Sequence, residues 1–235
     1  MSVAGVTAVE VAEQTRYRLV LPPTWVRLPM EASAMRTAAR AWLLRRYAAA
    51  PRDRTATLRR ELVEDLVALT RRAGAEYSRM LLVLAVEAQG RPISASCLVS
   101  VLPHPLPDEA SLQALAAMHE DALEVSVTEL GGSRGVVVVR DEVQPLSVPA
   151  GAEAEVQRIA DQVVTALGVV HDGPAEPWEP GRQRLVEVYL PVPDRDDTLL
   201  LAFATPLVPL FPALTELFVL MACSVQWQAD DGSWG

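Results

Sequence analysis

Residues 184–227 read RLVEVYLPVPDRDDTLLLAFATPLVPLFPALTELFVLMACSVQW. Two apolar runs flank the acidic segment PDRDDT, which predicts two strands joined by a tight turn. Prolines at positions 206, 209 and 212 predict a corner, and the apolar run around and after them predicts a helix followed by a short terminal strand. The stretch specifies packing in detail and carries no catalytic motif.

The segments upstream predict further short strands with helices between them. Strands are expected at 17–21 and 25–28, as a hairpin around Pro22–Pro23–Thr24, and then at 80–89, 93–102, 123–130 and 136–140. Apolar side chains at three- and four-residue spacing predict helices at 32–49, 55–73 and 153–167, and Asp108 is expected to cap a further helix at 109–121. Val-rich runs also form strands, so a strand stays the alternative at 153–167. A Pro- and Gly-rich loop is expected at 171–182.

These elements predict one α+β domain, a central antiparallel sheet covered by helices. The domain is expected to span 16–228, between a flexible tail at 1–15 and a polar tail at 229–235. The two helices within 32–74 are expected to form a helical hairpin inserted after the first two strands.

Composition favours a globular chain from a GC-rich genome. The 235 residues are 50% hydrophobic but only 5% aromatic, so the core must rely on Leu, Val and Ala. All 21 basic residues are Arg, and Asn is absent as well as Lys. Loss of the A-rich codons explains this pattern and indicates a bacterium such as an actinomycete.

Charge is distributed unevenly along the chain. The formal net charge is −9, yet residues 31–80 hold 11 Arg against 6 acidic residues, and residues 81–235 hold 7 Arg against 22 acidic residues. An acidic body repels phosphates, so nucleic acid is not expected as a partner. The Arg-rich segment predicts either a solvated helix face or a surface for an acidic partner.

The sequence predicts a cytoplasmic protein with no membrane insertion. Glu10 and Glu13 lie where a signal peptide would be apolar. The apolar run 207–225 is broken by Pro209, Pro212 and Glu216, which favours a buried helix. Cys97 and Cys223 lie in apolar patterns, and buried free thiols fit a reducing compartment.

The order of elements resembles that of the PsbP-like α/β/α sandwich superfamily. The residues that carry the resemblance are Trp25, the run 199–206, the helix at 213–221 and Trp227. The resemblance covers about residues 16–30 and 80–227, so the helical hairpin 32–74 would be an added element. Members of the superfamily mostly bind other proteins, which implies binding without catalysis. A related lipoprotein group carries a lipidated cysteine that this chain lacks.

Groups that could support chemistry are sparse, and no catalytic, cofactor-binding or metal-binding residue is predicted. His104, His119 and His171 show no metal-ligand spacing. Cys97 lies in an apolar strand, where packing is favoured over reactivity. GGSRG at 131–135 precedes a strand rather than a helix, so it predicts a hairpin turn and no phosphate loop. The acidic segment 194–197 predicts a solvated turn.

The remaining candidates are surface residues. Trp42, Arg45, Arg46 and Tyr47 gather the residue types that dominate interfaces, and Trp178 lies in the loop AEPWEPG. Core packing of Trp42 and local anchoring by Trp178 are the simpler interpretations. The sequence therefore predicts a non-enzymatic protein-binding adaptor, with a secretion or toxin/immunity system as one setting. The alternative is a small-molecule-binding domain with an apolar cleft between sheet and helices. A hydrolase that uses one of the three histidines is the least supported possibility.

Overall fold

The computed structural model describes residues 7–11, 17–46, 52–72, 77–88, 91–106, 108–119, 121–143, 182–207 and 210–228. Their strands are β1 (Thr7–Val11), β2 (Tyr17–Leu21), β3 (Trp25–Leu28), β4 (Ser78–Ala88), β5 (Arg91–Leu102), β6 (Glu124–Leu130), β7 (Ser133–Val143), β8 (Arg182–Pro191), β9 (Thr198–Thr205) and β10 (Gln226–Trp227). Their helices are α1 (Ala32–Arg46), α2 (Arg52–Arg72), α3 (Glu109–Ala117) and α5 (Phe211–Cys223). The predicted helix at 153–167 lies outside these ranges, as does the predicted loop except for Arg182.

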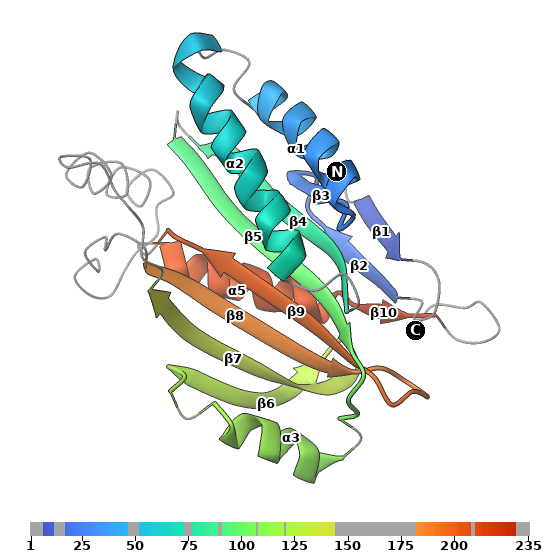
Figure 1. The fold of residues 1–235 in the computed structure, drawn as a ribbon. Coiled ribbons are helices and arrows are strands. Elements are labelled where there is room, and N and C mark those ends of the chain that lie inside the picture. The colour runs from blue at the N-terminus through green and yellow to red at the C-terminus, as the bar shows by residue number, and fades with distance from the viewer. Residues whose placement is uncertain are drawn as a thin grey trace, which may run out of the picture.

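A seven-stranded antiparallel sheet forms the centre of the fold (Figure 1). Its strand order is β3-β4-β5-β9-β8-β7-β6, with every neighbouring pair antiparallel. The predicted pairs β4–β5, β6–β7 and β8–β9 are all present. The architecture is therefore α+β, as the sequence predicts.

The predicted hairpin between the first two strands of the domain is wrong. β2 pairs with β1 and β10 in a separate three-stranded sheet, whereas β3 pairs with β4. The chain changes sheets at the proline turn, where the Trp25 amide donates to the Pro22 carbonyl at 3.1 Å. The apolar side chains of β2 and the Trp25 ring still pack in one core cluster. The apolar residues of the two strands are therefore buried together although the strands do not pair.

The predicted flexible tail at 1–15 also needs correction, because Thr7–Val11 forms β1. This strand lies antiparallel to β2, with Thr7 opposite Leu21 and Val11 opposite Tyr17. The ladder provides partners for backbone groups along one edge of β2, and β10 pairs with part of the other edge.

α1 and α2 cover one face of the sheet at its β3–β4 end (Figure 1). Both helices contribute to an apolar cluster with the strands beneath them, made of Leu28, Met35, Ala39, Leu43, Val63, Val67, Leu81 and Val83. α2 begins at Arg52, three residues before the predicted start at 55. The helical hairpin predicted at 32–74 thus provides a core layer for β3 and β4.

α5 and the small sheet pack on the opposite face and enclose the largest core. The rings of Phe203 on β9 and Phe218 on α5 stack with centroids 4.7 Å apart. Trp25 meets them edge-on, at 6.4 Å from Phe203 and 6.3 Å from Phe218. Cys97 is fully buried in the same cluster, and burial raises the pKa of its thiol. The predicted apolar helix after the proline corner is thus the main cover of this face.

α3 packs over β6 and β7, on the same side of the sheet as α1 and α2. Asp108 caps it as predicted, since its carboxylate accepts from the Ser111 amide at 2.7 Å. The β6–β7 turn then requires glycine, because Gly131 and Gly132 have φ values of 56° and 85°.

Gly131→Ala is expected to destabilise the protein more than Gly132→Ala. A Cβ at position 131 would lie 2.7 Å from the Cys223 carbonyl oxygen and 2.9 Å from that of Val225, whereas one at 132 meets nothing within 4 Å. We expect Gly132→Ala to cost about 1–2 kcal/mol of backbone strain. Gly131→Ala should cost about 1–3 kcal/mol more. Urea unfolding measures both, and equal losses would show that the approach to the end of α5 is unimportant.

A charged clamp joins β7 and β8 beside the start of α5. Arg184 donates to Asp141 through Nε at 2.6 Å, and Arg182 donates to the same carboxylate through Nε at 3.0 Å. The Arg184 guanidinium also lies 4.3 Å from the centre of the Phe211 ring. Burial opposes ionisation of Asp141, but the two arginines outweigh it and hold the pKa of that carboxyl below its usual value.

The clamp predicts acid sensitivity that Asp141→Asn should reduce. Because the folded-state pKa lies below the ordinary 3.8, the clamp stabilises fully above that value and is lost as pH falls through the folded-state pKa. The free energy of unfolding should therefore fall more steeply below pH 3.8 in the parent protein than in Asp141→Asn. Urea titrations across this range measure the difference. Parallel curves would mean that Arg182 and Arg184 do not lower the pKa of Asp141 in the folded protein.

Candidate functional site

An apolar strip of the central sheet lies between the two groups of helices that cover one face. It runs over β5, β9 and β8, and Figure 1 shows none of the labelled helices in front of β9 and β8, where α5 lies behind. We call this strip the sheet trough. Its floor consists of the half-buried side chains of Ser96, Leu98, Leu185, Leu200, Ala202 and Ala204.

Strand register places these side chains on the face that α2 and α3 cover. Leu81 lies opposite Leu98, Leu98 opposite Ala202, Ala202 opposite Glu187, and Glu187 opposite Val138. Side chains at paired positions share one face of the sheet. Since Leu81 packs under α1 and α2 while Val138 packs under α3, the positions between them form the trough.

The two faces of β9 differ sharply in burial. Leu199, Leu201 and Phe203 are fully buried against α5, whereas Leu200 and Ala202 are only half-buried. Leu185, Leu200, Ala202 and Ala204 also pack against none of the core clusters formed by the described residues. Apolar sheet side chains that the described helices leave only half-buried indicate a surface that another element covers.

The separation of the two helix-covered clusters follows from the strand order. The cluster beneath α2 spans β4 and reaches Leu98 on β5, and the cluster beneath α3 spans β7 and β6. With strands about 4.8 Å apart, those centres are separated by four strand intervals, or about 19 Å. Packed helices lie about 8–10 Å apart, so this separation is about twice the distance between two packed helices.

A polar group borders the trough on the side of α3. Glu187 is only 9% exposed, and its carboxylate accepts from Arg140 Nη2 at 2.9 Å. The Tyr189 hydroxyl donates to the second carboxylate oxygen at 3.4 Å. The His119 ring lies 5.9 Å from the Tyr189 ring, between centroids. Arg140, Glu187 and Tyr189 thus place charged and hydrogen-bonding groups at the edge of an otherwise apolar surface.

Burial and the neighbouring Glu187 charge raise the pKa of Tyr189 to about 12. The hydroxyl therefore remains protonated at neutral pH and serves as a donor to Glu187. A phenol that holds its proton so firmly is a poor general base.

The surface residues predicted from the sequence lie elsewhere. Trp42 is half-buried against the α1–α2 cluster, which agrees with the packing interpretation, and Arg45 is exposed near the end of α1. Arg46 ends α1, but its side chain is outside the description, as are Tyr47 and Trp178. The structure brings none of the described candidates into the trough. The run LLLAFAT at 199–205 carried the missed signal, because it is apolar on both strand faces.

The groups considered for chemistry do not assemble into a centre in the described part of the chain. His104 is exposed, and Thr198 donates to its backbone carbonyl rather than to its ring. Arg195 pairs with Asp197 at 2.9 Å, within the predicted acidic turn. Across the described ranges, no three His, Cys, Asp or Glu side chains are placed to hold a metal ion.

Arg140→Ala is expected to lower the free energy of unfolding by about 1–2 kcal/mol, because it leaves the buried Glu187 carboxylate with a weaker set of donors. Arg134→Ala is the matched control, since its pair with Glu109 is about half exposed on both sides. That substitution should cost about 0–1 kcal/mol. Glu187→Leu combined with Arg140→Ala should recover part of the loss. Urea unfolding tests the set, and equal costs at positions 134 and 140 would contradict it.

Comparison of the chain with models of protein families, with curated proteins and with solved structures finds no match. The resemblance to PsbP-like sandwich proteins therefore stays a prediction. Among the helices that the structure describes, none has the length and apolar character needed to cross a membrane.

Proposed function

We propose that this chain is a non-enzymatic adaptor that binds an amphipathic helix of another protein in the sheet trough. The observation that carries the proposal is the strip of apolar side chains on β9 and β8 that join no core cluster of the described residues. Burying such a strip on binding is favourable, at about 25 cal/mol per Å² of apolar surface.

The shape of the surface supports a helix as the occupant. The floor spans several strands between the clusters beneath α2 and α3, whereas small-molecule sites enclose most of their ligand. An incoming helix would place side chains at positions i, i+3, i+4 and i+7 against Leu98, Leu200 and Ala202. Arg140 and Glu187 would then meet a polar residue at its margin and fix its orientation.

Photocrosslinking at position 200 tests the proposal. Leu200 is replaced by p-benzoylphenylalanine in the protein expressed in its native host, and crosslinked peptides are identified by mass spectrometry. The control carries the same residue at Met118, which is 78% exposed at the C-terminal cap of α3. We expect position 200, and not 118, to crosslink a second protein at a segment with apolar residues at helical spacing.

Two charge insertions show whether the captured protein depends on the trough. Ala202→Glu should reduce co-purification of that protein at least about tenfold, because it places a charge on the apolar floor. Met118→Glu makes the same kind of change at an exposed site and should leave binding intact. Circular dichroism and urea unfolding confirm that both variants fold.

Three outcomes would refute the adaptor proposal. Crosslinks from position 200 to residues 144–181 of the same chain would show that the trough is closed internally. Crosslinks to a small apolar metabolite would favour a ligand-binding domain instead. Absence of any crosslink at position 200, with a labelled and folded protein, would show that the strip remains open to solvent in the cell.

A further inference from the structure

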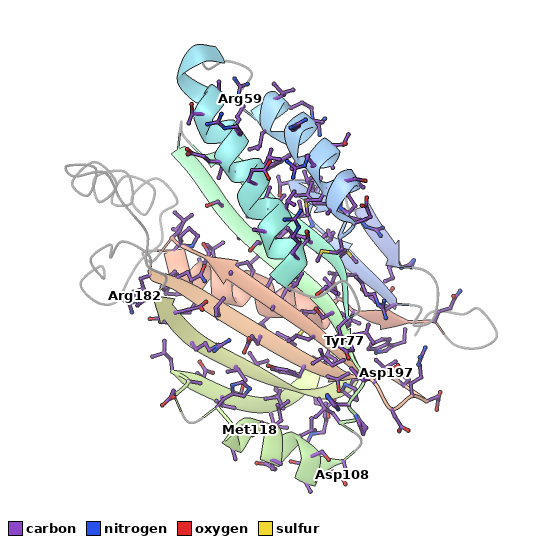
Figure 2. All side chains as sticks on the ribbon, in the orientation of Figure 1. Arg59, Tyr77, Asp108, Met118, Arg182 and Asp197 are labelled. Atoms are coloured by element: carbon purple, nitrogen blue, oxygen red, sulfur yellow. The ribbon has the colours of Figure 1, made fainter. Side chains whose placement is uncertain are left out.

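A hollow lies between α1 and α2, apart from the sheet trough. It has a volume of about 320 Å³ and is lined by Arg40, Leu43, Leu44, Ala56, Arg59, Arg60, Val63 and Glu64. Figure 2 shows Arg59 between the two helices, toward the end where α1 ends and α2 begins. We call this hollow the hairpin cleft.

The base of the hairpin cleft is apolar and part of it faces solvent. Leu43 and Val63 are buried in the cluster beneath the helices, at 1% and 2% exposure. Leu44 is 56% exposed, although its neighbour Leu43 is buried. Leu44 therefore offers exposed apolar surface at the edge of the hollow, where an incoming apolar side chain can contact it.

The rim of the hairpin cleft is basic. Arg40, Arg59 and Arg60 line it, and the one acidic residue of the lining is Glu64. Glu64 is held by Arg36, whose Nη2 donates to Oε2 at 3.0 Å while Nη1 donates to Oε1. This hydrogen bonding lowers the pKa of Glu64. The charges of Arg36 and Arg40 also act on Glu64. The lining of the cleft thus carries three arginines and one glutamate.

Arginines around an apolar hollow complement one class of segment, acidic residues that flank apolar ones. Guanidinium groups pair with carboxylates through two hydrogen bonds, and the apolar hollow takes a leucine-sized side chain. A nucleic acid complements this surface less well. The chain carries a net charge of −9, and an extended phosphate backbone would meet that field beyond the arginines.

We propose that the hairpin cleft binds an acidic amphipathic segment of a partner protein. Apolar side chains of the segment enter between Leu44 and Ala56, and its carboxylates pair with Arg40 and Arg60. The cleft is a docking site in addition to the sheet trough, and the proposal does not depend on the trough being occupied.

A synthetic helical probe tests the hairpin cleft directly. The probe is a fluorescein-labelled peptide of about 16 residues built from Glu, Ala and Leu, with leucines at i and i+4. A second peptide replaces each Glu by Lys, and a third replaces each Leu by Ser. Fluorescence anisotropy with the full chain measures binding at low and high salt. We expect the acidic leucine peptide to bind best, and more weakly as salt rises.

Variants with matched controls localise the binding. Leu44→Glu and Arg60→Glu should each weaken binding at least about tenfold. Met118→Glu makes the same exposed-apolar-to-acid change on α3, and Arg79→Glu makes the same charge reversal at an exposed position on β4. Both controls should bind as the parent does. Ala202→Glu should also bind normally, which separates failure of this proposal from failure of the adaptor proposal.

The proposal is overturned by any of four results. The Lys peptide could bind as well as the acidic one, or Leu44→Glu could leave binding unchanged. The acidic peptide could fail to bind at any soluble concentration. Light scattering could instead reveal a dimer of the parent protein that Leu44→Glu dissociates, which would make a second copy of this chain the occupant.

Discussion

The structure depends on the need to cover an antiparallel sheet whose central strands are apolar on both faces. β9 buries Leu199, Leu201 and Phe203 on one side, where α5 and the small sheet enclose the largest core. On the other side the described helices form two separate clusters, one at each end of the strand order. The β9–β8 face between those clusters is the part of the sheet that the described helices leave incompletely covered.

Local sequence patterns predicted most of the secondary structure but not how all the strands pair. Two hairpins were predictable from their turns, the glycines at 131 and 132 and the acidic turn at 194–197. A short connection leaves the two strands that it joins little choice of partner. The same reasoning failed at Pro22–Pro23–Thr24. The turn there carries the chain from one sheet to the other, and the pairing of β2 with β10 joins residues more than two hundred positions apart. Contacts between distant segments determine which strand pairs with β2, and a local sequence pattern contains no information about them.

Neither proposed surface could be located from the sequence, although its residue types were visible. The trough exists because register aligns Leu98 on β5 with Ala202 on β9 and Glu187 on β8, and β5 lies far from the other two strands in the sequence. The hairpin cleft exists because Leu44 on α1 faces Ala56 and Arg60 on α2 across a hollow. Of the residues predicted at 42–47, Trp42 packs against the cluster beneath the helices, whereas Leu44, two positions on, is the exposed apolar side chain.

α2 connects the two surfaces, since one of its sides lines the hairpin cleft with α1 and its buried residues pack on β4 beside the trough. Movement of α2 away from α1 would widen the cleft and narrow the trough. Such movement must disturb the contacts of Val63 and Val67 with Leu81, and close-packed interiors resist gradual change of this kind. The apolar cluster under the helices therefore sets how far each surface can adapt.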